Sequence, residues 1–517
     1  VVEYHYDMLT DILAGYGMKR YTESHEDGTA MIGDGMEVKR KAFVPMAAMW
    51  MSGGFSDTYK YQSDIRESAS VAHIYGQNLV AAESLTAFGL GGNAWGFVPS
   101  NLKPTADIEM ANGLNRFVIH TSVHQPLDDK IPGIGLGPFG QWFNRHDTWS
   151  GKAKAWTDYL SRSSHLLQQG KFVADIVYYY GQDNNITGLY RSALPKLPVG
   201  YSYDFINRDA LETVLSVKDG KFVTPSGMSY RVLVLDSNAR RMSLSVLRKI
   251  RDMVKAGGTV TGVKPETPFG VTDDKNEFNT IVAELWGDGD AVRNVGNGKV
   301  YAGAGAANAL SGMKVIKDFS YPGQTDDPDL LYVHRTLPGQ DIYWVNNRTD
   351  KYRSVNADFR VSGREVEVWH PETGAKEPAS YIAMEGLTRV TLNLTPNDAV
   401  FVVFAGPNKY TMFGAPSKSE STLMKLEGPW TVHFQADRGA PASATFDKLT
   451  DWTNHADPGI KYFSGTGTYL KTIKVDAKDL AKGQTWIDLG VVKDLAEVYV
   501  NGKSAGITWK APYRVNV

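Results

Sequence analysis

The chain of 517 residues contains no cysteine, which excludes disulfide bonds and thiolate metal sites. It also has no apolar run near the roughly 20 residues that span a bilayer, so we expect no membrane span. Charge of one sign is not in excess: 55 basic and 57 acidic side chains leave a formal net charge of -2, and no basic stripe stands out to gather phosphates. The composition therefore argues against a nucleic-acid partner.

Tyrosine (26), tryptophan (12) and glycine (51) are plentiful. This profile is common in extracellular sugar-handling proteins, whose aromatic rings stack on the apolar faces of pyranoses, and it is as typical of any large protein rich in β-structure. The chain starts at Val1 with neither an initiator methionine nor a signal peptide, so we expect a fragment of a longer protein.

Helical and strand patterns alternate over residues 1–170, which predicts a parallel sheet. The helices are expected at 4–16, 64–76 and 106–115, and the strands at 18–22, 43–50, 79–82 and 116–121. Asp64, Arg66 and Glu67 fit a solvated first turn of their helix. Four strands are half of what a closed (β/α)8 barrel contains, so this region is predicted to be the C-terminal half of such a barrel.

The remaining chain predicts a multidomain protein that combines α/β and all-β parts. Residues 171–315 alternate strand and helix like a flavodoxin-like α/β domain, and their glycines form no G-x-G-x-x-G pattern, so no nucleotide or organic cofactor is expected. Residues 316–405 predict an antiparallel β-sandwich, residues 406–424 a linker, and residues 425–517 a last all-β unit that looks truncated. In that unit, Asn501-Gly502 predicts a type I′ hairpin.

Two carboxylates follow short apolar strands in the barrel-like region. Glu83 comes after Leu79-Val80-Ala81-Ala82, and Glu23 comes after the strand at 18–22. Parallel barrels place catalytic acids at this edge, and paired carboxylates are the chemistry of glycoside hydrolysis. Glu23 is also compatible with a solvated loop, whereas an ionisable Glu83 after four apolar residues is costly to bury without a task or a partner.

Five short motifs resemble the catalytic module of the glycoside hydrolase family 106 α-L-rhamnosidases. They are Tyr21-Thr22-Glu23-Ser24-His25-Glu26, Pro45-Met46-Ala47-Ala48-Met49-Trp50, Ser70-Val71-Ala72-His73-Ile74-Tyr75-Gly76, Ala82-Glu83-Ser84-Leu85-Thr86 and Phe143-Asn144-Arg145-His146. The resemblance covers the first third of the chain. The end of the chain resembles the galactose-binding-like jelly roll found beside many glycosidases. The sequence departs from the family at Ala48, where family members carry a glutamate.

The resemblance implies an exo-acting, inverting hydrolase that removes terminal α-L-rhamnose from pectic or other complex glycans, often with a calcium ion at the sugar site. Glu83 and Glu23 would then be the catalytic pair, with Glu83 as the proton-bearing acid and Glu23 as the ionised base. Glu26 is a candidate metal ligand. The candidate substrate-binding residues are His25, Trp50, His120, His124, Arg145 and His146. Structural roles would explain them as well, with the histidines bonded to neighbouring groups in their loops and Trp50 packed at the rim of the barrel.

Two other functions stay open at this point. One is another barrel glycosidase, such as a β-galactosidase-like enzyme with the same accessory domains. The other is a non-catalytic carbohydrate-binding protein, which Ala48 and the jelly roll would suit. In each case the expected partner is an oligosaccharide or polysaccharide and the expected location is secreted or periplasmic in a bacterium, while the sequence gives no oligomeric state.

Overall fold

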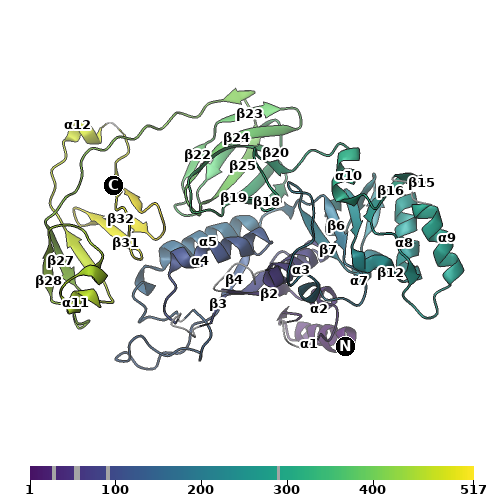
Figure 1. Ribbon diagram of the computed structural model, residues 1–517, viewed down its shortest axis with the longest axis horizontal. Helices are drawn as coiled ribbons and strands as arrows, with labels where there is room; N and C mark the ends of the chain where they lie inside the picture. Colours follow the sequence, from purple (N-terminus) through teal and green to yellow (C-terminus); the bar gives the residue numbers. More distant parts are fainter. Residues whose placement is uncertain (26–30, 52–58, 89–93, 142, 288–291, 482) are drawn as a thin grey trace. The chain divides into compact units, whose positions relative to one another are not determined.

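The computed structural model describes residues 1–517 except for 26–30, 52–58, 89–93, 142, 288–291 and 482 (Figure 1). The chain divides into two units. The first comprises residues 1–122, 136–141 and 156–415, and the second comprises residues 123–135, 142–155 and 416–517. Within the described ranges, no helix is long and apolar enough to cross a membrane.

A four-stranded parallel sheet in the order β1-β2-β3-β4 forms the N-terminal part of the first unit. Its strands are β1 (Tyr21–Thr22), β2 (Val44–Met51), β3 (Ala81–Ala87) and β4 (Arg116–Ile119). The prediction for the third strand is wrong at its end, because β3 continues to Ala87 and Glu83 lies inside it. The sheet has half the strands of a closed (β/α)8 barrel.

Two helices cover one face of this sheet. Ile65 of α3 (Tyr59–Tyr75) and Ile108 of α4 (Pro99–Ala111) pack on Ala47 and Ala82. Side chains alternate along a strand, so Ala48 and Glu83, which are paired in register, point to the other face. The other helices here are α1 (Met8–Gly15), which follows a π-helical turn (Val2–Asp7), α2 (Gly35–Lys39) and α5 (Lys154–Leu167).

The predicted helix over residues 106–115 is wrong in its bounds. Helix α4 begins seven residues earlier, at Pro99, and ends at Ala111. Proline is favoured in the first turn of a helix because it has no N–H to leave unpaired there, and this start signal was missed. A second proline, Pro104, lies inside the helix.

A second, mainly parallel sheet has the order β15-β16-β13-β11-β6-β7. Counted along the chain, its parallel strands run 2-1-3-4-5, which is the flavodoxin order, and β15 adds an antiparallel edge. The strands are β6 (Ile176–Tyr179), β7 (Tyr203–Ile206), β11 (Val232–Leu235), β13 (Thr259–Gly262), β15 (Arg293–Val295) and β16 (Gly298–Ala302). The helices are α6 (Ile186–Leu189), α7 (Arg208–Thr213), α8 (Leu244–Lys255), α9 (Lys275–Trp286) and α10 (Gly305–Gly312).

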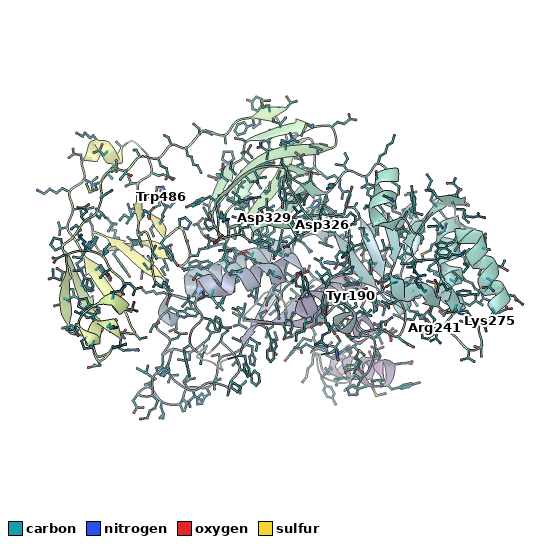
Figure 2. All side chains as sticks on the ribbon, in the orientation of Figure 1. Tyr190, Arg241, Lys275, Asp326, Asp329 and Trp486 are labelled. Atoms are coloured by element: carbon teal, nitrogen blue, oxygen red, sulfur yellow. The ribbon has the colours of Figure 1, made fainter. Side chains whose placement is uncertain are left out.

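Smaller strands and aromatic contacts complete this domain. They are β8 (Ser216–Lys218), β9 (Lys221–Val223) and β10 (Ser229–Tyr230) in one sheet, and β12 (Arg241–Met242) with β14 (Thr267–Pro268) in another. Tyr190, labelled in Figure 2, stacks on Phe205 with 5.2 Å between ring centroids, and its hydroxyl donates to Asp236 at 3.1 Å. These contacts hold the chain after α6 against the carboxyl ends of the strands.

Two antiparallel sheets follow and enclose one core of aromatic and branched side chains. One contains β17 (Phe319–Ser320), β20 (Arg353–Phe359), β24 (Leu387–Leu394), β23 (Tyr381–Met384) and β26 (Met412–Phe413). The other contains β22 (Lys376–Pro378), β21 (Arg364–Trp369), β25 (Ala399–Pro407), β19 (Gln340–Asn347), β18 (Leu330–Leu337) and β5 (Lys171–Phe172). Strand β26 lies in the expected linker, so part of residues 406–424 belongs to a sheet.

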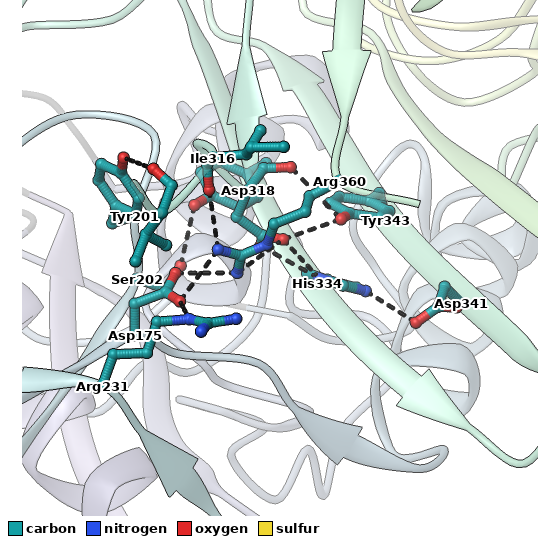
Figure 3. A network of polar contacts seen from close by, with 12 residues as sticks. Asp175, Tyr201, Ser202, Arg231, Ile316, Asp318, His334, Asp341, Tyr343 and Arg360 are labelled. Atoms are coloured by element: carbon teal, nitrogen blue, oxygen red, sulfur yellow. Dashed lines mark hydrogen bonds and ion pairs between the residues drawn. The ribbon is translucent and has the colours of Figure 1, made fainter. Parts of the chain in front are cut away.

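A buried ionic network joins the flavodoxin-like sheet to these antiparallel sheets (Figure 3). The guanidinium of Arg360 donates to both oxygens of Asp175 at 3.0 and 2.9 Å and lies 3.3 Å from Asp318. His334 contacts Asp318 at 3.0 Å through Nδ1 and Asp341 at 3.1 Å through Nε2. An imidazole that faces carboxylates with both nitrogens donates from both, so His334 is charged here.

The second unit contains only short elements in its described part. Its strands are β27 (Trp430–Phe434), β28 (Ser443–Phe446) and β29 (Gly467–Leu470) in one sheet, β30 (Trp486–Asp488) with β33 (Arg514–Asn516), and β31 (Ala496–Val500) with β32 (Lys503–Thr508). Its helices are α11 (Pro458–Lys461) and α12 (Ala477–Leu480). Asn501 and Gly502 have φ values of 51° and 78° between β31 and β32, which confirms the predicted type I′ turn.

Candidate active site

Four of the predicted site residues belong to or follow the four parallel strands, one for each strand. Glu23 follows β1, Trp50 lies near the end of β2, and His120 follows β4, whereas Glu83 lies inside β3, four residues before its end. These residues are far apart in the sequence, and the sheet brings Glu23, Trp50 and His120 to one edge because parallel strands end on the same side.

The register of the sheet places three of them on one face. Glu83 is paired with Val118 of β4, and His120 comes two residues later, on the same face. Trp50 is paired with Thr86, and this face is turned away from α3 and α4. Val118, the partner of Glu83 in β4, is exposed.

Glu23 belongs to the same face. Tyr21, two residues before it, is paired with Val44, which points away from the helices. The next residue, Ser24, turns to the helix side, where its hydroxyl donates to Glu67 of α3 at 2.9 Å. Because side chains alternate along extended chain, Glu23 points to the side of Glu83.

Glu83 is half-buried, and one of its oxygens accepts a hydrogen bond from the hydroxyl of Thr86 at 2.6 Å. Residues three apart in a regular strand point to opposite faces, so this contact requires an irregularity. Met49 is paired with Ser84 but Trp50 with Thr86, which leaves Leu85 as an extra residue with a φ of 66°. This β-bulge turns Thr86 onto the face of Glu83.

A segment from the long loop supports the bulge. The N–H of Gly140 donates to the carbonyl oxygen of Ala87 at 2.9 Å, and the side-chain amide of Gln141 donates to the carbonyl oxygen of Leu85. Gly140 has a φ of 113°, a conformation that disfavours any residue with a Cβ. The loop is therefore joined to the end of β3 beside Glu83.

The same segment builds an aromatic cluster with residues near the ends of β2 and β3. The ring of Phe139 lies 5.5 Å from Trp50 and 5.4 Å from Phe88 between centroids, and both phenylalanines are partly exposed. Such rings can stack on the apolar face of a sugar. Phe88 carries no local signal in the sequence, because its contact with Phe139 depends on how the loop returns to β3.

Buried charges lie on the opposite side of the sheet, under the helices. Lys39 forms ion pairs with Asp64 at 2.8 Å and with Glu67 at 2.9 Å, and Asp64 also accepts the N–H of Ala48 at 3.0 Å. Burial raises the pKa of Asp64, while the charge of Lys39 opposes that rise. The predicted solvated turn is wrong for Asp64 and Glu67, because other elements cover this part of α3.

The remaining predicted residues lie elsewhere. His25 is half-buried after β1, and Glu26 lies outside the described residues. His124, Arg145 and His146 belong to the second unit, where Arg145 donates to Asp128 at 2.7 Å and His146 contacts the carbonyl oxygen of Leu127 at 3.0 Å. Within the described ranges, no three His, Asp or Glu side chains form a group that could hold a metal ion.

Comparisons with known proteins identify the family. A sequence model described as α-L-rhamnosidase matches residues 1–383. A protein of Formosa agariphila, named as a candidate β-glucuronidase, is 36% identical over 408 residues, which are 77% of this chain and 32% of that protein. The structure of a rhamnosidase from Novosphingobium sp. PP1Y superimposes with a TM-score of 0.95 and 41% identity, over 100% of this chain and 49% of that one. The chain thus spans about a third and about half of these two relatives.

Proposed function

The chain belongs to glycoside hydrolase family 106, the α-L-rhamnosidase family, and from this premise we propose that it carries the catalytic edge of an exo-acting, inverting α-L-rhamnosidase. The substrate would be terminal α-L-rhamnose on pectic or other complex glycans. The observation that supports this proposal is that Glu23 follows β1 and Glu83 lies in β3, two strands apart in one parallel sheet. The four parallel strands would be the C-terminal half of a (β/α)8 barrel.

The spacing of the strands suits inversion. Two strand spacings, about 10 Å, separate the backbones at Glu23 and Glu83, and carboxyl groups on the inner face of a curved sheet converge. Inverting enzymes hold their two carboxyl groups roughly 6.5–9.5 Å apart so that a water molecule fits beside the anomeric carbon. Ala48 of β2 is paired with Glu83 and lies between the two strands, where its small side chain leaves room for the sugar.

The two carboxyl groups differ in exposure, which supports different roles. Glu83 is half-buried, and we assign it the proton that passes to the leaving glycosidic oxygen. Glu23 is exposed, and we assign it the removal of a proton from the attacking water. Water attacks the anomeric carbon as the glycosidic bond breaks, so one proton leaves at Glu23 and one is supplied by Glu83.

Three further features belong to the proposal. Trp50 and Phe139 would stack on the sugar, and His120 would hydrogen-bond to its hydroxyl groups. Calcium stays a prediction: the described residues offer no cluster that fits the ion, so no step is derived through it. A secreted or periplasmic location in a bacterium would be checked by fractionating cells.

The test is the hydrolysis of p-nitrophenyl α-L-rhamnoside by the natural full-length protein and its variants. Glu83→Gln and Glu23→Gln should each lower kcat by about 10²–10⁴-fold, while the exposed Glu385→Gln should not change it. NMR of the first product should show β-L-rhamnose. Near-full activity in both site variants would remove this pair from the mechanism, and an α-anomeric first product would contradict inversion.

One comparison favours a second candidate, a β-glucuronidase, because the Formosa agariphila relative carries that name. A panel of aryl glycosides that includes β-glucuronide, β-galactoside and α-L-rhamnoside separates these activities. Turnover of the β-glucuronide alone would replace the rhamnosidase proposal. Tight glycan binding with no turnover of any member would instead support a non-catalytic carbohydrate-binding protein.

A further inference from the structure

A hollow of about 520 Å³ lies within the second unit, between the long loop and the β27–β29 sheet. This volume falls in the range of small-molecule sites, about 300–1,000 Å³. Its lining residues fall within the segments 145–151, 433–438 and 466–468. Arg145 and His146, which the proposed active site does not use, are among them.

The sheet supplies a polar wall because side chains alternate along β27. Val432 and Phe434 belong to the hydrophobic core of this unit, so His433 between them points to the other face. Thr468 of β29 is paired with His433 and shares that face. Both residues are exposed, and both line the hollow. An imidazole and a hydroxyl therefore lie side by side on this wall.

Arg438 lies in the turn between β27 and β28 and also lines the hollow. It is half-buried, and within the described residues its side chain makes neither an ion pair nor a hydrogen bond. A guanidinium presents its N–H donors in a planar fork that matches a carboxylate. The Arg438 side chain is therefore available to bind an anion in the hollow.

The loop wall is fixed by its own contacts. Arg145 donates to Asp128 at 2.7 Å and to the carbonyl oxygen of Gln125 at 2.7 Å. A carbonyl oxygen can only accept, so Nε2 of His146 donates to the carbonyl oxygen of Leu127 at 3.0 Å. These contacts hold both side chains in place before a ligand binds, which lowers the cost of binding.

The chemistry of the two walls favours an acidic sugar. Arg438 can bind the carboxylate of a uronic acid through two parallel hydrogen bonds. The hydroxyl of Thr468 can donate to and accept from the hydroxyl groups of a pyranose. Asp147 adds a carboxyl group to the loop wall, and burial raises its pKa to about 6. Near pH 5 this group is mostly protonated, so it does not repel an anion and can donate to a sugar hydroxyl.

We propose that this hollow is a second carbohydrate site of the chain, which binds a uronic acid unit of a glycan. Arg438 holds the carboxylate of that unit, and His433, Thr468 and the loop wall bind its hydroxyl groups. The inference deepens the proposed function, on which the choice of a pectic ligand rests, because it names an acidic sugar as part of the substrate.

The experiment is isothermal titration calorimetry of the natural full-length protein at about pH 5, where a uronic acid is ionised. The probes are trigalacturonic acid and its methyl ester, which keeps the hydroxyl groups but carries no charge. Wild type should bind the acid at least about tenfold more tightly than the ester, because hydrogen bonds to charged groups are the stronger ones. Arg438→Ala should remove this preference.

Three further variants separate the guanidinium from charge in general. Arg438→Lys keeps a charge but loses the planar fork, so its affinity for the acid should lie between those of wild type and Arg438→Ala. His433→Ala should weaken the acid and the ester alike, by about threefold or more. Lys448→Ala is the matched control: it removes an exposed positive charge of the same unit outside the hollow and should leave both affinities unchanged. Thermal unfolding shows whether each variant is folded, and Arg438→Gln replaces Arg438→Ala if the latter is not.

No binding of the acid, equal binding of acid and ester by wild type, or a preference that survives in Arg438→Ala would overturn the inference. Inorganic sulfate that binds as tightly as the acid would also overturn it, because the hollow would then be a site for simple anions. The proposed function fails separately, through an active Glu83→Gln variant, since p-nitrophenyl α-L-rhamnoside contains no carboxylate.

Discussion

Arg360 offers a direct measurement of how strongly the flavodoxin-like domain is joined to the antiparallel sheets (Figure 3). Its side chain is only 15% exposed, and its partners Asp175 and Asp318 are exposed by 3% and 1%. Replacing Arg360 with Met keeps the length and the apolar stem but removes the charge. Two buried carboxylates then lose a cation.

Breaking a buried ion pair costs roughly 3–5 kcal/mol, because the remaining charge stays out of water. Asp175 keeps Arg231 at 3.0 Å, and Asp318 keeps His334 and the hydroxyl of Tyr343. We therefore expect the lower end, about 3 kcal/mol, which lowers Tm by roughly 6–12 °C for a cooperative unit of 150–250 residues.

The measurement is differential scanning calorimetry of wild type and Arg360→Met between pH 4 and pH 8. Burial raises the pKa of Asp318, but the charges of His334 and Arg360 lower it below its ordinary value. Removing the arginine raises that pKa, so the loss of stability should shrink towards pH 4, where Asp318 takes up a proton. Arg389→Met is the matched control, because Arg389 makes the same two-bond contact with Asp358, at 2.7 and 2.9 Å, on the protein surface. A surface pair of this kind contributes about 1 kcal/mol or less.

The outcome that refutes this reasoning is an Arg360→Met variant as stable as Arg389→Met. A large loss that does not change with pH would also refute it, since the effect would then come from packing and not from charge.

Three further perturbations test other parts of the structure. Burial lowers the pKa of His334, but the charge of Asp318 and hydrogen bonds with Asp318 and Asp341 raise it above its ordinary value. The stability that His334 contributes is therefore complete below the unfolded pKa of about 6.5. It is lost as the pH rises through the higher pKa of the folded state. His334→Gln should remove that part of the pH dependence in thermal unfolding, and an unchanged pH dependence would contradict this role. Lys39→Met leaves two carboxylates unpaired behind β1 and β2, and should lower the free energy of unfolding by about 3–5 kcal/mol in denaturant titrations at pH 7; a loss below about 1 kcal/mol would show that the pairs add nothing. Gly140→Ala places a Cβ 3.0 Å from a methyl carbon of Thr121 at a φ of 113°. It should cost roughly 1–3 kcal/mol and lower kcat/KM for the aryl rhamnoside, and a neutral result would mean that the loop does not shape the site.

The ionic network of Figure 3 also shows why the sequence alone could not identify the charged residues that join the two domains. Asp175, Asp318 and Arg360 come from segments far apart in the chain, and none of them stood out by its neighbours in sequence. Their contact depends on the packing of two domains, so only the tertiary structure makes them partners.

The sequence determined the periodic features of this chain. Short apolar stretches gave four parallel strands, the Asn501-Gly502 pair gave a hairpin, and the motifs around Glu23 and Glu83 gave the family. These features are local, because the period of a strand and the φ preference of a turn are properties of a few consecutive residues.

Only the tertiary structure decided where those residues point and what supports them. The bulge at Leu85, which brings Thr86 to Glu83, has no local signal, since leucine does not favour a positive φ. The burial of Asp64, Glu67 and Glu109 likewise cannot be inferred from helices that look polar in sequence. The physical reason is that strain and buried charge are stable only where distant segments hold them, so these features belong to the packed chain and not to any stretch of it.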